Sequence, residues 1–85
     1  MKRATKATLS ALDPWLDDVR GLGIDGLVEK ANGSFSQRRN RILHFHEDDD
    51  GVYADVKVRG EWQRVGVDRA AGRREVVRLL RTQYC

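Results

Sequence analysis

Cysteine, proline and long apolar runs are almost absent from this chain of 85 residues. Its single cysteine, Cys85, cannot close an internal disulfide, so we expect a reducing, cytoplasmic location. No apolar run approaches the roughly 18 residues of a membrane-spanning helix. No apolar segment follows the basic residues 1–6, which argues against a signal peptide. The composition therefore predicts a cytoplasmic protein without membrane association.

Aromatic residues and net charge are also limited. Two Trp, two Tyr and two Phe must supply much of the core of a domain this short, whose stability is expected to be marginal. The 16 Lys and Arg exceed the 13 Asp and Glu by only three charges, too few to indicate nucleic acid by themselves. Twelve of the basic residues are arginines, which suit bidentate contacts with phosphate or carboxylate. The distribution of the arginines therefore matters more than their number.

The most patterned stretch is residues 42–58, ILHFHEDDDGVYADVKV. Two runs of β-branched and aromatic residues, Ile42–His46 and Val52–Val58, flank an acidic segment that ends in glycine. Aspartate and glycine favour tight turns because they tolerate positive φ. The pattern predicts a β-hairpin with a turn at residues 47–51.

A register centred on the three aspartates pairs His46 with Tyr53 and His44 with Asp55. Because side chains alternate along a strand, one face of this hairpin is apolar, and Ile42 falls on the opposite face. The polar side chains expected on that opposite face are His44, His46, Tyr53, Asp55 and Lys57.

The N-terminal part contains a helix signal at Asp13-Pro14. Asp is a preferred N-cap and Pro a preferred first residue, so a helix is predicted from Pro14 to about Leu22. The alternative is one longer helix from Ala7 that Pro14 kinks. Residues 1–6 are expected to form a frayed basic tail, and residues 7–85 a single domain.

Three further strands are predicted around the central hairpin. Leu27–Ala31 and Ser34–Arg39 flank Asn32-Gly33, a dipeptide typical of two-residue hairpin turns. Glu61–Val67 follows a short turn at Arg59-Gly60, with Trp62, Val65 and Val67 as packing residues. The first two strands are candidate edge strands, whose free backbone groups could pair with a twin or another protein.

Asp68 is the predicted N-cap of a final helix from about Arg69 to Gln83. The order helix, four to five antiparallel strands, helix predicts an α+β fold with both helices on one face of the sheet. The other face is expected to be partly solvated and to carry the histidines. The predicted core comprises Trp15, Leu16, Val19, Leu27, Phe35, Leu43, Phe45, Val52, Ala54, Val56, Val58, Val65, Val77 and Leu80.

The histidine face is a candidate site for a divalent metal. His44 and His46 point the same way on a strand, and Asp55 lies across from them in the expected register. Two imidazoles and a carboxylate form a ligand set of catalytic zinc and non-haem iron sites. The alternative is a solvated face whose histidines hydrogen-bond Asp55 and Tyr53. The run Asp48–Asp50 does not match a calcium loop, because glycine and glutamate are missing at the required positions.

An enzyme without a metal is a weaker alternative. Asp55 could orient His44 as a general base. The chain lacks a recognisable nucleophile motif, and the glycines at 21, 23 and 26 have the wrong spacing for a dinucleotide-binding fingerprint. The sequence therefore leaves enzymatic activity undecided and favours its absence.

Arginine clusters make nucleic acid a further candidate partner. The candidate phosphate contacts are Arg38, Arg39 and Arg41 before the central hairpin and Arg74, Arg78 and Arg81 on the final helix. The alternative is a helix face that is solvated and salt-bridged. The helix–strands–helix order is similar to that of double-stranded RNA-binding domains. Residues 65–74 contain no lysine where that family has a glycine- and lysine-rich run, so none of its binding residues is carried over.

The segments GLVEKANGSFSQRR and LHFHEDDDGVYADVKVRGEWQRVGV together resemble a small group of bacterial proteins of uncharacterised function. The shared features are a histidine-containing strand, an acidic turn and a following strand, over about residues 22–80. The resemblance implies a compact bacterial cytoplasmic domain and supplies no activity. The leading expectation is a non-enzymatic binding or regulatory module of unknown ligand, with a protein partner or a homodimer as possible assemblies.

Overall fold

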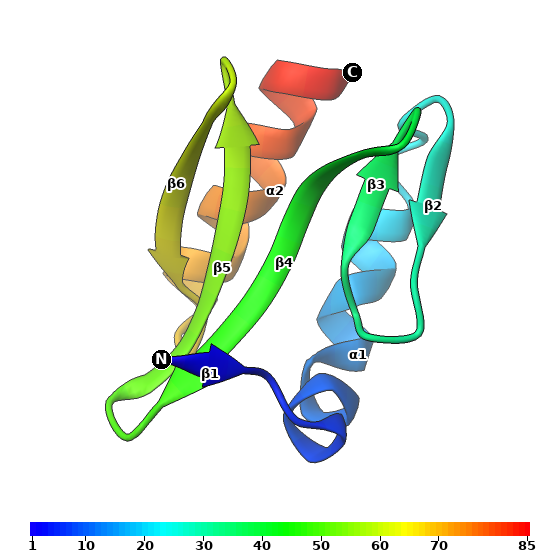
Figure 1. Ribbon diagram of the computed structural model, residues 1–85. Coiled ribbons are helices and arrows are strands. Elements are labelled where there is room, and N and C mark those ends of the chain that lie inside the picture. The colour runs from blue at the N-terminus through cyan, green and yellow to red at the C-terminus, as the bar shows by residue number, and fades with distance from the viewer.

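The computed structural model describes all 85 residues as two helices and six strands (Figure 1). The chain order is β1 (Lys2–Arg3), α1 (Lys6–Arg20), β2 (Leu27–Glu29), β3 (Phe35–Gln37), β4 (Asn40–Asp48), β5 (Gly51–Val58), β6 (Glu61–Gly66) and α2 (Ala70–Tyr84). Neither helix is long and apolar enough to cross a membrane.

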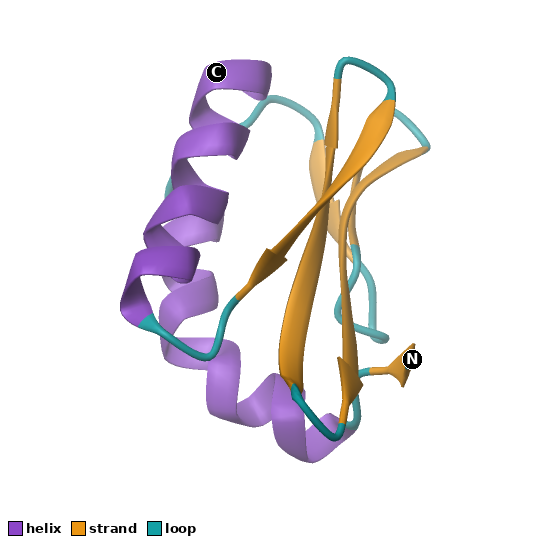
Figure 2. Cartoon of the chain, turned by 90° about the vertical axis from the view of Figure 1, so that its left-hand side faces the viewer, coloured by secondary structure: helices purple, strands orange, loops and turns teal.

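All strands pair antiparallel in one sheet with the order β2-β3-β4-β5-β6. The short β1 lies beside the part of β4 that β3 does not reach, where Lys2 pairs with Glu47 and Arg3 with His46. Figure 2 shows both helices on one side of the sheet, so the opposite face is not covered by a helix. The predicted α+β fold is confirmed, with β1 as an additional strand. β2 and β6 are the end strands of this order, whereas β3, a predicted edge strand, is interior.

The central hairpin has the predicted register. His44 pairs with Asp55 and His46 with Tyr53 across a turn at residues 49–50. The placement of Ile42 opposite the core is wrong, since Ile42 is 2% exposed and belongs to the core. Phe35 pairs with Leu43, but the next pair joins Ser36 to Arg41, so Ile42 is an extra residue in β4. This β-bulge interrupts the alternation of side chains and lets Ile42 and Leu43 both face the helices.

Helix α1 begins well before the predicted start at Pro14. Thr5 is the N-cap, and its hydroxyl oxygen accepts a hydrogen bond from the Thr8 amide at 3.2 Å. Pro14 lies inside the helix, so the N-cap at Asp13 is wrong and the alternative of a longer helix is correct. Pro14 removes one backbone donor. The helix persists because an apolar stripe on both sides of the proline is buried, namely Leu12, Leu16 and Val19.

The first residues do not form the frayed tail that was expected. Lys2 and Arg3 pair with β4, and Ala4 is 7% exposed within the core. The Glu47 carboxylate accepts hydrogen bonds from the Thr5 amide at 2.6 Å and the Thr8 hydroxyl at 2.9 Å. These bonds hold the start of α1 against β4, and they keep the pKa of Glu47 below its ordinary value.

Helix α2 confirms the predicted position of the final helix but not its cap. Arg69 is the N-cap and makes no capping bond through its side chain. The carboxylate of Asp68 instead accepts a hydrogen bond from the Val52 amide at 3.0 Å, which joins the loop before α2 to β5. The first turn of α2 lies so close to β6 that a Cβ on Gly72 would clash with the Gly66 carbonyl oxygen.

Two connections differ from the predicted turns. Asn32-Gly33 does not form a two-residue turn, because residues 30–34 make a longer loop in which Asn32 Oδ1 accepts a bond from the Ser34 amide at 3.0 Å. The two-residue turn lies instead between β3 and β4, at Arg38 and Arg39. Both arginines have positive φ, 50° and 72°, values that favour Gly or Asn. The predicted strand to Arg39 therefore ends at Gln37.

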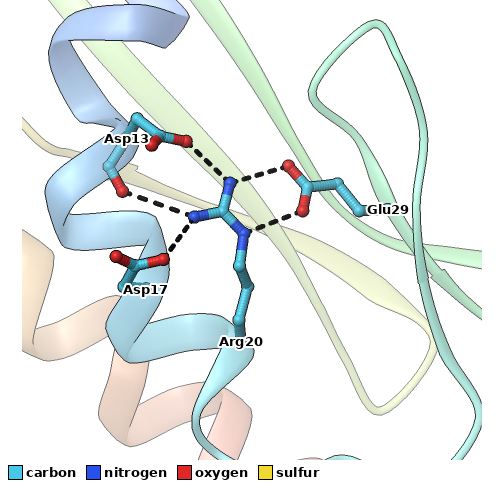
Figure 3. Close-up of polar contacts among 4 residues, drawn as sticks. All are labelled: Asp13, Asp17, Arg20 and Glu29. Carbon is cyan, nitrogen blue, oxygen red and sulfur yellow. Dashed lines mark hydrogen bonds and ion pairs between the residues drawn. The ribbon is translucent and has the colours of Figure 1, made fainter.

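Arg20 joins α1 to the edge strand β2 (Figure 3). Its Nε and Nη2 atoms donate to both carboxylate oxygens of Glu29 at 2.8 and 2.9 Å. Further bonds of 2.7 Å reach Asp13 and Asp17 on α1 itself. The bonds to Glu29, Asp13 and Asp17 raise the pKa of Arg20 above its ordinary value. Because this network uses the guanidinium N–H donors of Arg20 within the fold, none of them is free to bind a ligand.

The core lies between the helices and the sheet. The predicted core residues are either buried in it or half-buried against it. Buried residues outside the predicted core list include Leu12, Ile24, Ile42, Val67, Val76 and Leu79. Trp62, one of the packing residues predicted for the last strand but not part of the predicted core, is 45% exposed and does not pack in the core.

Candidate ligand-binding face of the sheet

The sheet face away from the helices, here called the open face, gathers the chemically active side chains of the chain. Residues directly opposite each other on neighbouring strands share a face. The register therefore places on the open face Arg3, Ser36, Arg41, His44, His46, Tyr53, Asp55, Lys57, Trp62 and Arg64. All the polar residues that the sequence placed opposite the core lie on this face.

Asp55 is the centre of the open face and is 4% exposed. Arg64 on β6 donates to both of its oxygens, from Nε at 2.8 Å and from Nη2 at 2.9 Å. His46 Nδ1 lies 3.0 Å from Oδ2 and donates to it, while His44 Nδ1 is 3.8 Å away. The hydrogen bonds from Arg64 lower the pKa of Asp55, and the carboxylate in turn raises the pKa of Arg64. Asp55 is thus an ionised carboxylate that already accepts three hydrogen bonds within the protein.

His44 lies between the rings of His46 and Trp62. Its ring centroid is 4.7 Å from that of His46 and 4.4 Å from that of Trp62, both in edge-to-face arrangements. Burial lowers the pKa of His44, and this effect outweighs the nearby Asp55 charge. His44 is therefore a neutral imidazole at pH 7. The carboxylate orients His46 rather than His44, contrary to the pairing expected for a general base.

Trp62 and Arg64 are site residues that the sequence reasoning missed. Trp62 lies beside His44, and the Lys57 ammonium sits 4.9 Å from its ring centroid, within cation–π range. The sequence did contain a signal for them, because side chains alternate between the two faces along Glu61–Gly66. Trp62 and Arg64 therefore point to the face opposite that of Val65. The apolar character of tryptophan favoured the core, whereas the alternation correctly indicated the open face.

The proposed metal ligands come together in the structure. The donor atoms of His44, His46 and Asp55 all lie within 4.8 Å of one another. A neutral His44 is in the right state to act as a ligand. The guanidinium of Arg64, however, covers both oxygens of Asp55, so a cation at this point would have to displace Arg64.

The predicted nucleic-acid contacts are separated by the fold. Arg41 lies on the open face and Arg38 and Arg39 at the adjoining β3–β4 turn. The other three lie on α2, in the helical layer: Arg74, Arg78 and Arg81. Arg78 is engaged by Glu75 at 2.6 and 2.9 Å. The two groups therefore do not form one continuous basic surface.

No protein-family model, curated protein or solved structure matches this chain. The resemblance to a bacterial protein group thus stays an expectation from the sequence.

Proposed function

We propose that the protein is a binding module that takes single-stranded nucleic acid on the open face of its sheet. The observation that carries this proposal is Trp62, a tryptophan 45% exposed on a helix-free sheet face, flanked by His44 and Lys57. An exposed aromatic ring on a sheet offers a stacking surface for an unpaired base. Cations beside such a ring attract the phosphate backbone.

The charges of the open face support an anionic ligand. Its only buried carboxylate, Asp55, is neutralised by Arg64. Arg3, Arg41 and Lys57 form no ion pair with a carboxylate and add positive charge around the aromatic rings. A single strand fits better than a duplex, because bases in a duplex cannot stack on a protein ring and the acidic turn at residues 48–50 would repel a second strand.

Fluorescence titration with a short single-stranded oligonucleotide tests the proposal. Trp62 is exposed, whereas Trp15 packs against Phe45 in the core, so binding is expected to quench the Trp62 signal. Because Trp62→Ala removes this reporter, the affinities of wild type and variants are compared by the fluorescence anisotropy of the same oligonucleotide carrying a dye. Trp62→Ala is expected to weaken binding about tenfold, since stacking contributes about 1–3 kcal/mol per base. Arg74→Ala on α2 is the control and should leave affinity unchanged. Equal binding by Trp62→Ala and wild type would refute the proposal, as would the absence of binding at low salt.

A divalent cation such as Zn²⁺ is a second candidate ligand, favoured by the clustered donors of His44, His46 and Asp55. Because Arg64 competes for the carboxylate, Arg64→Ala is expected to strengthen zinc binding, and His46→Gln to weaken it. The readout is the movement of the histidine ring NMR signals on addition of zinc. Unchanged histidine signals in wild type and in Arg64→Ala would exclude this function.

We also propose a cytoplasmic location for the protein. The free thiol of Cys85 is exposed, which fits a reducing compartment.

A further inference from the structure

A cavity of about 500 Å³ lies along β3 on the open face, next to the aromatic site. Its wall comes from the loop between β2 and β3, from β3, from the β3–β4 turn and the start of β4, and from Lys57 on β5. The basic residues that line it are Lys30, Arg39, Arg41 and Lys57. Two asparagines and two serines complete the wall, and no carboxylate and no apolar side chain contributes to it.

The four cations of this cavity have no counter-ion in the protein. None of them forms an ion pair, whereas Arg20, Arg64 and Arg78 each engage a carboxylate at 2.9 Å or less. Like charges that share one concave surface repel each other and raise the local positive potential. A bound anion would remove that repulsion.

Neutral donors of the same cavity are also unused. Asn32 Oδ1 accepts bonds from the amide and the hydroxyl of Ser34, so the orientation of the Asn32 side-chain amide is fixed by its contacts. Its NH₂ group makes no hydrogen bond within the protein. Ser36 is 9% exposed, and its hydroxyl likewise has no protein partner. Hydroxyl and amide donors beside arginines and lysines match the several acceptor oxygens of a phosphate group.

The β3–β4 turn holds Arg39 in place at an energetic cost. Arg38 and Arg39 both adopt left-handed backbone geometry, which costs a residue with a Cβ atom about 1 kcal/mol. Asn-Gly would form this turn without that cost. Arginine at these positions is therefore unfavourable for the turn itself, while Arg39 contributes a guanidinium to the cavity.

We infer that this cavity binds a phosphate group, and that it takes the phosphate of the nucleotide whose base stacks on Trp62. Lys57 links the two subsites, because it lines the cavity and its ammonium lies 4.9 Å from the Trp62 ring centroid. The assignment of the phosphate to a nucleic acid rests on the proposed function. The phosphate site itself rests only on the cavity and its unpaired donors.

The test is NMR titration of the full chain, observed at the backbone amides of Ser34, Ser36 and Asn40, with inorganic phosphate at constant ionic strength. Phosphate is expected to shift these amides and chloride is not. Arg39→Gln combined with Arg41→Gln is expected to weaken phosphate binding at least about tenfold, because each substitution removes a charge-assisted contact. Arg74→Gln with Arg81→Gln removes the same charge from α2 and should have no effect. Absent phosphate shifts, or equal shifts with chloride, would overturn the site.

Two further experiments distinguish a nucleic acid from a lipid headgroup as the source of the phosphate. With a single-stranded oligonucleotide, the Arg39 and Arg41 variant and Trp62→Ala should both weaken binding, whereas Trp62→Ala should leave inorganic phosphate binding intact. Phosphate binding without oligonucleotide binding would retain the cavity site and refute the nucleic-acid function. Displacement of phosphate by vesicles containing a phosphoinositide, but not by the oligonucleotide, would assign the cavity to a lipid headgroup and overturn the nucleotide assignment.

Discussion

Replacement of Asp55 by alanine is expected to destabilise the protein far more than replacement of Glu75. Both carboxylates bind an arginine through two hydrogen bonds, at 2.8 and 2.9 Å for Asp55–Arg64 and at 2.6 and 2.9 Å for Glu75–Arg78. They differ in burial, since the side chain of Asp55 is 6% exposed and that of Glu75 is 37% exposed. The two variants therefore compare one interaction in two environments.

Asp55→Ala removes two charge-assisted bonds and leaves Arg64 and His46 without their acceptor. A hydrogen bond to a charged group contributes about 1.5–3 kcal/mol, and Arg64, which is 49% exposed, regains part of this from water. We expect a net loss of about 2–3 kcal/mol in the free energy of unfolding. For a domain of this size that corresponds to a decrease in Tm of roughly 10–20 °C. The exposed Glu75→Ala variant should show no measurable shift.

The pH dependence supplies a second measurement on the same variant. Because the folded state lowers the pKa of Asp55 below its ordinary value of 3.8, this carboxylate stabilises the fold above pH 3.8. Its contribution is lost as the pH falls through the folded pKa. Urea unfolding of wild type and Asp55→Ala should therefore differ at neutral pH and converge in strong acid. Equal destabilisation by Asp55→Ala and Glu75→Ala at pH 7 would refute the assignment of Asp55 as a buried, paired charge.

Three further predictions concern other parts of the fold. Burial lowers the pKa of His44 from 6.5, so wild type should lose stability as the pH falls below 6.5, and His44→Phe should lack that part of the decrease in urea unfolding. Gly72→Ala should lower stability by about 1–3 kcal/mol in thermal unfolding, because the new Cβ meets the Gly66 carbonyl. Arg20→Ala should speed amide hydrogen exchange in β2, because Glu29 loses its link to α1.

The central hairpin was predictable because local signals agree there. Alternation and a turn-forming acidic segment both specify the pairing of His44 with Asp55, and the structure has this pairing. The burial of Ile42 was not predictable, because the bulge that turns it inward arises from the register between β4 and β3, two strands whose pairing depends on the whole sheet.

The start of α1 shows tertiary packing overriding a local signal. Asp13-Pro14 has the chemistry of a helix start, yet Leu12 is buried one residue before Asp13. The burial of Leu12 and Leu16 on the same helix face compensates for the hydrogen bond that Pro14 cannot make. The sequence pattern contains the local signal of the proline but not the tertiary burial of Leu12 and Leu16. The prediction of a helix that starts at Pro14 was therefore wrong.

The cavity proposed to bind phosphate has no local signature in the sequence. Lys30, Arg39, Arg41 and Lys57 come from a loop, a turn and two strands, and only the sheet register brings them to one surface. The arginines of α2 form a clearer periodic pattern, but the fold places them on the other layer. Periodicity therefore drew attention to the α2 arginines, whereas only the sheet register reveals the arginines of the cavity.

The residues of the open face divide into those that the fold uses and those that it does not. Asp55, Arg64 and His46 are joined by hydrogen bonds to one another. A solvent-exposed face of an antiparallel sheet therefore explains their presence without any ligand. The exposed Trp62 and the cations of the cavity form no side-chain hydrogen bond and no ion pair within the chain, and Trp62 contacts His44 and Lys57 through its ring. Substitutions in the first group should therefore change stability, and substitutions in the second group should change binding at constant Tm. If substitutions of Trp62 or of the cavity cations lowered Tm as much as Asp55→Ala does, these side chains would also stabilise the fold. No ligand would then be needed to explain their presence on the open face.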